Sequence, residues 1–155
     1  MAKPPIGTVS FRNLDQVTDE LHQLFEGWQH KPSLNRVLSP FAIEVLKLAV
    51  HEWVANLVQH GDFSGREPEI SLQLAGSDGR VHCLIEDNSD RFDFQNQLGC
   101  QRDLIEGSVP PDRGRGLLML IACTRDLSYQ SNTPGRQRLQ FWVAGDGGES
   151  WDIPF

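Results

Sequence analysis

The sequence of 155 residues predicts one α/β domain, and two kinds of hydrophobic pattern support this. Apolar residues recur at helical spacing over residues 14–28 and 41–57, and at alternate positions over 70–85 and 127–143. The composition, 39% hydrophobic and 23% charged, suits a compact domain with its own core. A formal net charge of −7, with only 14 Lys plus Arg, argues against a nucleic-acid-binding surface.

Localisation and redox state are constrained by two further observations. No apolar run is long enough to span a bilayer and residues 1–5 carry no signal-peptide pattern, so we expect a cytoplasmic protein with no membrane partner. Cys83, Cys100 and Cys123 are odd in number and widely spaced, unlike a zinc site or a disulfide framework. We therefore expect buried or idle thiols in a reducing compartment.

The first third of the chain predicts a strand and a helix. Residues 8–12 alternate in polarity and predict a short strand. A helix follows over residues 14–28, and Asn13 or Asp15 can cap it. Residues 30–38 are interpreted as a polar connection to the next helix.

The remaining strands are predicted to form two hairpins. Alternation predicts strands over 70–74 and 81–85 around the turn 76–79, and over 127–131 and 138–143 around the turn 132–135. Between the hairpins, residues 99–112 lose periodicity and gain glycine and proline, which predicts either a disordered connection or a mobile lid. The tail, residues 145–155, is interpreted as flexible.

The helix predicted over residues 41–60 is the centre of the pattern. Ser39 is a suitable N-cap, Pro40 suits the first helical position, and Gly61 ends the helix. One face is deeply apolar and consists of Ile43, Leu46, Val50, Trp53, Val54 and Leu57.

Three polar residues of this helix lie four apart, on one stripe beside the apolar face: Glu52, Asn56 and His60. One interpretation is a polar edge that faces water. The other is that Glu52 and Asn56 face a ligand, with a metal ion or a phosphate as partner, because such groups are costly on an apolar helix unless something satisfies them. For His60, a helix-capping role is the preferred interpretation.

Asp87 stands at the end of the strand predicted over 81–85. A period of two places it on the same face as Val81, Cys83 and Ile85, which would make it a buried carboxylate aimed at a hydrogen-bond donor such as a purine amino group. Alternatively the alternation ends there and Asp87 caps a turn, because residues 86–90 are rich in turn formers.

The segment Gly114–Gly116 precedes an apolar helical pattern. Glycines at that place allow backbone N–H groups to approach an anion, and the helix dipole favours negative charge. A plain glycine-rich loop is the alternative.

The order of these motifs resembles the GHKL ATP-binding superfamily, and in particular the bacterial anti-sigma-factor serine kinases of partner-switching systems. HEWVANLVQHG is similar to the N box of that family, EDNSDRFDF to its first glycine box and DRGRGLLML to its second. The resemblance covers roughly residues 8–144. It implies a two-layer α/β sandwich of the Bergerat type, with a mixed, mostly antiparallel sheet and helices on one face. Residues 1–155 would be a single domain with an ATP lid at 99–113.

The resemblance also implies roles for individual residues. Asn56 would ligate Mg²⁺, Glu52 would act as general base on a serine hydroxyl, and Asp87 would accept from the adenine amine and so select ATP over GTP. The remaining residues assigned to the nucleotide are Ser89, Phe92, Gly114, Arg115, Gly116 and Leu117.

Two positions depart from the family pattern. Ser89 stands where the first glycine box has its glycine, and Gln137 stands where a threonine is common after the glycine near the last strand. Both belong to the base-binding side of the pocket, where the side chain of Ser89 is expected to crowd the adenine or to change the backbone turn. The phosphate and metal side is intact.

The function implied is an ATP-dependent serine/threonine kinase of anti-sigma type. It would bind a sigma factor or a similar regulator, phosphorylate a small antagonist protein of STAS type on serine, and form a homodimer. Because of Ser89 and Gln137, two alternatives stay open: a catalytically weak or inactive switch module that binds a partner, and a small stand-alone ATPase.

Overall fold

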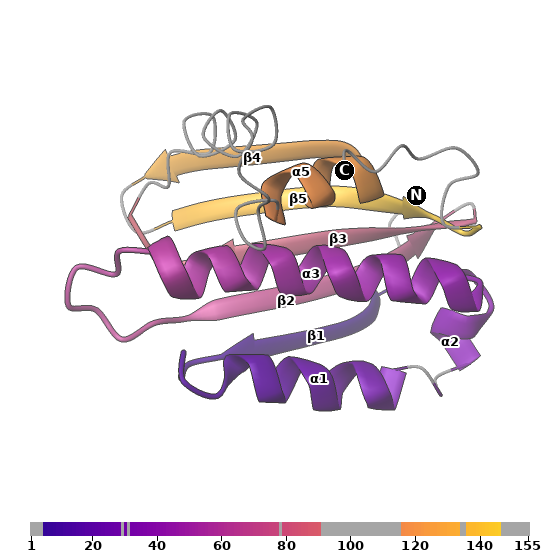
Figure 1. Ribbon diagram of the computed structural model, residues 1–155, viewed down its shortest axis with the longest axis horizontal. Coiled ribbons are helices and arrows are strands. Elements are labelled where there is room, and N and C mark those ends of the chain that lie inside the picture. The colour runs from indigo at the N-terminus through magenta and orange to yellow at the C-terminus, as the bar shows by residue number, and fades with distance from the viewer. Residues whose placement is uncertain are drawn as a thin grey trace, which may run out of the picture.

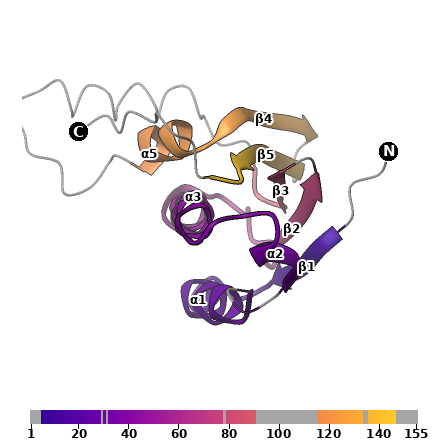
Figure 2. The same ribbon diagram turned by 90° about the vertical axis from the view of Figure 1, so that its right-hand side faces the viewer.

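The computed structural model describes residues 5–28, 30, 32–77, 79–90, 116–133 and 136–146. A five-stranded sheet forms one layer, and the helices lie together on one of its faces (Figures 1 and 2). This two-layer α+β arrangement confirms the predicted fold class. The predicted lid at 99–113 and the tail beyond residue 146 lie outside the described residues.

The sheet has the strand order β1-β2-β3-β5-β4. Its strands are β1 (Pro5–Phe11), β2 (Ile70–Ser77), β3 (Arg80–Asp87), β4 (Arg125–Thr133) and β5 (Arg136–Ala144). Each of the four neighbouring pairs is antiparallel, so the described part of the sheet does not contain the parallel pair that a mixed sheet would have. Both predicted hairpins are confirmed, with strands one to three residues longer at some ends than the alternation indicated.

The described helices are α1 (Val17–Trp28), α2 (Pro32–Asn35), α3 (Pro40–His60) and α5 (Gly116–Cys123). The short helix α2 corrects the prediction of a plain polar connection. Leu34 explains it, because this side chain is fully buried in the core and one helical turn brings it there.

Both ends of α3 are fixed as predicted. The Ser39 hydroxyl accepts a hydrogen bond from the backbone N–H of Ala42 at 3.1 Å. At the other end the N–H of Gly61 donates to the Leu57 carbonyl at 2.9 Å. A Cβ built at Gly61 would lie 2.5 Å from that carbonyl oxygen, so close approach of the backbone, at an ordinary φ of −68°, is what requires glycine here.

The core lies between the helices and the sheet. All six residues of the predicted apolar face of α3 are buried, and alternate residues of β3 are buried against them. Cys83 and Cys123 are free, buried thiols, as expected, and burial raises the pKa of both, that of Cys123 to about 11. Cys100 lies outside the described residues.

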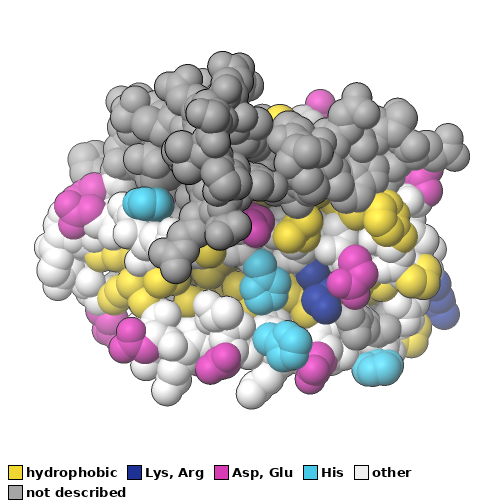
Figure 3. Space-filling model, viewed as in Figure 1, with side chains coloured by type: hydrophobic (Ala, Val, Ile, Leu, Met, Phe, Trp, Pro, Cys, Tyr) yellow, Lys and Arg dark blue, Asp and Glu magenta, His cyan; other side chains and the backbone are white. Residues whose placement is uncertain are grey.

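The surface agrees with the charge of the chain. On the helical face, Asp and Glu side chains are spread over the described surface, whereas Lys and Arg are few (Figure 3). Among the described residues, no helix combines the length and the apolar character needed to cross a bilayer.

Candidate functional site

Asn56 is a buried polar residue in the middle of the apolar packing of α3. Its side chain is 8% exposed, so it does not form the water-facing edge that was one of the two interpretations. Its Nδ2 donates a hydrogen bond to the Glu52 carbonyl at 2.7 Å. Since only the amide NH₂ group can donate to a carbonyl, the carboxamide oxygen of Asn56 must turn away from the helix backbone. The carboxamide oxygen of Asn56 is therefore available as an acceptor on the side that faces away from the helix backbone.

Glu52 lies one helical turn earlier, half-buried on the side of α3 that packs against α5. Burial raises the pKa of its carboxyl group. Its charge also adds to the raised pKa of Cys123, which shows that the carboxylate lies near α5. His60, in contrast, is exposed in the last turn of α3. Of the three polar residues that lie four apart on α3, Glu52 and Asn56 are thus shielded from solvent, and His60 lies on the surface.

Asp87 ends β3 on the inward face and is 6% exposed. Its Oδ1 accepts from the backbone N–H of Ser89 at 2.9 Å and also from the Ser89 hydroxyl. Its Oδ2 is buried and has no hydrogen-bond partner among the residues that the structure describes. Burial raises the pKa of this carboxyl, and the two bonds from Ser89 oppose the rise. Both interpretations of Asp87 hold together: the alternation continues inward, and the same side chain caps the turn.

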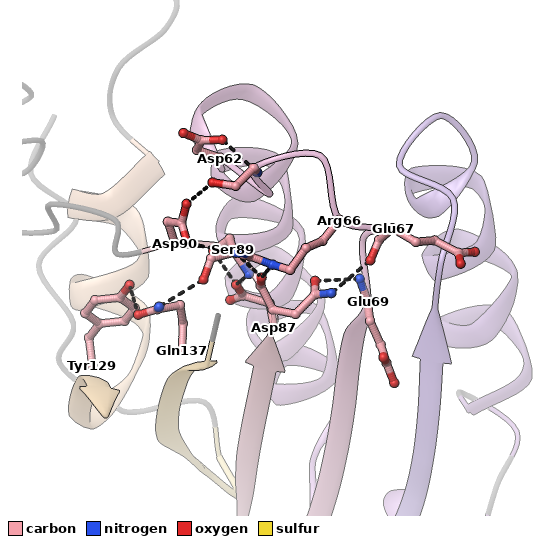
Figure 4. Close-up of polar contacts among 11 residues, drawn as sticks. Asp62, Arg66, Glu67, Glu69, Asp87, Ser89, Asp90, Tyr129 and Gln137 are labelled. Atoms are coloured by element: carbon pink, nitrogen blue, oxygen red, sulfur yellow. Dashed lines mark hydrogen bonds and ion pairs between the residues drawn. The ribbon is translucent and has the colours of Figure 1, made fainter. Parts of the chain in front are cut away.

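The two residues that depart from the family pattern are in direct contact. The Gln137 Nε2 donates to the Ser89 carbonyl at 3.0 Å, and the Tyr129 hydroxyl donates to Gln137 Oε1 at 3.0 Å (Figure 4). Gln137 lies directly opposite Asp87 in the register of β3 with β5. The Ser89 side chain is fully buried, with its hydroxyl turned onto Asp87. Sequence reasoning treated the two departures as separate, and it did not identify Tyr129.

A second network, which the sequence did not predict, holds the turn after β3. The Arg66 guanidinium donates to the Asn88 carbonyl, at 3.1 Å from Nε and 2.9 Å from Nη2, and to Asp90 Oδ1 at 2.8 Å. The Ser64 hydroxyl donates to the other oxygen of Asp90, and this bond, followed by Arg66, lowers the pKa of that carboxyl. Arg66 is the single cation between residues 61 and 79, which is the signal that could have indicated it.

The Asn88 side chain joins the same turn to the segment before β2. Its Oδ1 accepts from the Glu69 N–H at 2.8 Å, and its Nδ2 donates to the Glu67 carbonyl at 2.8 Å (Figure 4). The partners of the Asn88 side chain are backbone groups of Glu67 and Glu69, so these bonds fix the main chain before β2 next to the turn that follows Asp87.

A cavity of about 400 Å³ opens at the end of the sheet where β2 and β3 meet this turn. Its lining consists of Glu69, Ser71, Glu86, Asp87, Asn88, Arg136 and Gln137. It brings Asp87 and Gln137 together, whereas Glu52 and Asn56 do not line it. Of the other predicted site residues, Gly116 begins α5 and Leu117 follows it in the first turn. Phe92, Gly114 and Arg115 lie outside the described residues.

These groups fit the ligand that the resemblance implies. A buried acceptor without a partner, Asp87 Oδ2, suits an amino group. The carboxamide oxygen of Asn56 is the hard donor that Mg²⁺ prefers, and Mg²⁺ usually keeps several waters and takes one or two protein ligands. Among the residues that the structure describes, no group of three His, Cys, Asp or Glu side chains could hold a metal ion.

Comparison with known proteins identifies the family of the chain. The model of the histidine kinase-like ATPase domain matches residues 16–142. The serine-protein kinase RsbW of Bacillus velezensis is 30% identical over 99 residues, which cover 59% of each chain. The serine-protein kinase RsbW of Bacillus subtilis is 36% identical over 62 residues, or 40% of this chain and 37% of that protein. The matched segments thus span less than two thirds of these relatives. With the family model matched over most of its length, the chain belongs to the histidine kinase-like ATPase domain family.

Proposed function

We propose that the protein is an ATP-dependent serine/threonine kinase that regulates a partner by phosphorylating a small antagonist protein. The observation that carries the proposal is the buried Oδ2 of Asp87, which has no hydrogen-bond partner among the described residues. It lies in a chain that matches the histidine kinase-like ATPase domain over residues 16–142. Similarity to two proteins named serine-protein kinases supports protein phosphorylation over ATP hydrolysis alone.

In this proposal each shielded polar group has one task. Asp87 accepts from the 6-amino group of adenine, and the Asn56 oxygen ligates Mg²⁺, which neutralises charge on the phosphates when bound. Glu52 takes the proton of the substrate serine hydroxyl while the serine oxygen forms its bond to the γ-phosphorus and the bond from that phosphorus to ADP breaks. The raised pKa of Glu52 suits it, because a general base works best with a pKa nearer the operating pH.

The partners follow from the same similarity. We propose a sigma factor or a similar regulator as the bound partner, and a STAS-type antagonist protein as the phosphate acceptor. A phosphoserine carries about two negative charges. On the helical face, the described Asp and Glu side chains outnumber the Lys and Arg side chains (Figure 3). Like-charge repulsion would therefore oppose rebinding of the phosphorylated antagonist, and the regulator could take its place.

The binding part of the proposal is tested by calorimetric titration of the protein with Mg-ATP, Mg-ADP and Mg-GTP. We expect adenine-selective binding that depends on magnesium, and a loss of at least about tenfold in Asn56→Ala, because the variant removes one oxygen ligand of the metal ion. Absence of ATP binding to the wild-type protein would contradict the proposal and favour a module that binds a partner without nucleotide.

The catalytic part is tested by phosphate transfer from γ-labelled ATP to a STAS-type antagonist of the same organism. Glu52→Gln is the informative variant, and Glu44→Gln is its matched control: it makes the same change at an exposed position of the same helix. Transfer that is lost in the first variant and kept in the second supports the assignment. Release of free phosphate without any labelled acceptor would instead identify a stand-alone ATPase.

A further inference from the structure

A directed chain of hydrogen bonds ends on the carboxylate of Asp87. The Tyr129 hydroxyl donates to Gln137, the Gln137 amide donates to the Ser89 carbonyl, and the Ser89 hydroxyl donates to Asp87 Oδ1. The direction is fixed by chemistry, since an ionised carboxylate only accepts and a backbone carbonyl only accepts. The two bonds of Ser89 involve different groups: Gln137 holds the Ser89 backbone carbonyl, and the Ser89 hydroxyl separately donates to Asp87.

The chain is buried and anchored at both ends. Ser89 is 0% exposed and Gln137 is 2% exposed, so these bonds lie where water does not compete with them. Tyr129 packs its ring against Trp53 of α3, with ring centroids 5.5 Å apart. Gln137 reaches the turn from the position directly opposite Asp87 on β5. The arrangement thus connects α3, β4 and β5 to the end of β3.

The consequence for Asp87 is an asymmetry between its two oxygens. Oδ1 accepts two bonds from Ser89, while the buried Oδ2 accepts none from the described residues. The terminal torsion of an aspartate is broad and nearly two-fold, so a carboxylate without such bonds has no preferred oxygen or direction. The backbone N–H and the hydroxyl of Ser89 together remove that freedom, and the hydroxyl is the side-chain part of this restraint.

We propose that Ser89 and Gln137 together determine base specificity: they hold the Asp87 carboxylate so that its Oδ2 receives the 6-amino group of adenine and opposes a purine that lacks it. The proposal rests on the proposed function, because it requires that the site bind ATP. Ser89 and Gln137 are positioning residues in it, since they act through Asp87. From the sequence, Ser89 was expected to crowd the adenine or to change the backbone turn; in this proposal it positions Asp87 instead.

The test compares two nucleotides that differ by one group, Mg-ATP and the Mg complex of purine riboside 5′-triphosphate, which lacks the 6-amino group. Calorimetric titration of the wild-type protein should show a preference of at least about tenfold for ATP, as expected for a hydrogen bond to a charged group. In Ser89→Ala the preference should fall by about tenfold, through weaker ATP binding, while affinity for the riboside triphosphate stays within about twofold.

Ser64→Ala is the matched control, because it also removes a serine hydroxyl that donates to an aspartate, but at an exposed position. It should keep the preference for ATP. Gln137→Met provides a second variant of similar side-chain length that lacks both hydrogen bonds. It should lower the preference in the same direction, with its folding checked by thermal unfolding.

The outcomes separate the two proposals. A wild-type protein that binds neither triphosphate overturns the proposed function and this inference with it. A wild-type protein that prefers ATP, with an unchanged preference in both Ser89→Ala and Gln137→Met, overturns the positioning role alone. An equal loss of affinity for both triphosphates does the same, because it indicates a structural role without base selection.

Discussion

Replacing Asp87 by asparagine separates the stability of the site from its function. The change keeps the shape of the side chain and removes its charge. The asparagine oxygen can still accept both bonds from Ser89, although they lose the assistance of charge. At the position of Oδ2, a buried acceptor without a partner becomes a buried donor without one. Either costs about 1–3 kcal/mol, so this part of the exchange is nearly neutral.

The pH dependence of stability follows from the raised pKa of Asp87. A carboxyl whose pKa is higher in the folded than in the unfolded state binds more protons when folded. In the wild-type protein this contribution is fully present below the unfolded pKa, and is lost as pH rises through the folded pKa. Each pKa unit corresponds to about 1.4 kcal/mol. Asp87→Asn has no such titration, so its stability relative to wild type should improve as pH rises from about 4 to 8.

Whereas Asp87→Asn should gain stability relative to the wild-type protein at higher pH, its affinity for ATP should fall. The variant presents an NH₂ group, which donates, to the 6-amino group of adenine, which also donates. Loss of a hydrogen bond to a charged group costs about 1.5–3 kcal/mol, or roughly ten- to a hundredfold in affinity. Urea denaturation at several pH values and calorimetric titration at pH 8 measure the two effects. Asp19→Asn, which removes the same charge from an exposed position in the first turn of α1, is the control for both.

One result would refute this reasoning. Breaking a buried hydrogen-bond network costs about 2 kcal/mol or more of unfolding free energy. If Asp87→Asn lost that much at pH 8 and still bound ATP as tightly as the wild-type protein, Asp87 would be a structural group. The buried oxygen would then have no connection with a nucleotide.

Three further predictions concern Glu52 of α3, Gly61 at the end of that helix and Gly27 of α1. Glu52→Gln should slow phosphate transfer by at least about a hundredfold and change the affinity for ATP by no more than about twofold. The transfer rate of the wild-type protein should rise with pH through a midpoint above the pKa of an ordinary glutamate, because Glu52 acts deprotonated and burial raises its pKa. If Glu44→Gln altered the pH profile equally, this prediction would be contradicted. Gly61→Ala, which places a Cβ 2.5 Å from the Leu57 carbonyl oxygen, should lower the unfolding free energy by about 1–3 kcal/mol in urea denaturation. Gly27→Ala, in helix α1 with nothing within 4 Å, should raise it by about 0.5–1 kcal/mol.

Periodicity predicted the elements that bury a regular face. The apolar face of α3 and the alternation of β3 through Asp87 were both visible, because regular spacing translates directly into which side chains turn inward. The four-residue helix α2 was missed, since one turn contains too few positions to show a period. Leu34 and Leu38, both buried and four residues apart, were its signal.

The polar contacts of the site could not be predicted in the same way. Gln137 and Ser89 lie 48 residues apart, and Arg66 and Asn88 lie 22 apart. Such pairs leave no periodic trace, and each residue type taken alone is common in turns and on sheet surfaces. Sequence reasoning found the position of Ser89 through the family pattern and expected its side chain to crowd the adenine or to change the backbone turn. The structure shows the hydroxyl donating to Asp87, a contact that the sequence did not predict.

This geometry bears on whether the pocket is a working site or a scaffold. A scaffold requires only that the turn after β3 be held, and the Arg66 and Asn88 contacts hold it through backbone groups. The turn therefore has supports other than the Asp87 carboxylate, which also caps it through Ser89. A buried carboxylate with one unpaired oxygen makes the empty protein less stable at neutral pH than a neutral group would, because burial opposes its ionised form. That disadvantage disappears when a ligand supplies a donor, which is why the unpaired oxygen of Asp87 favours a nucleotide site over a scaffold.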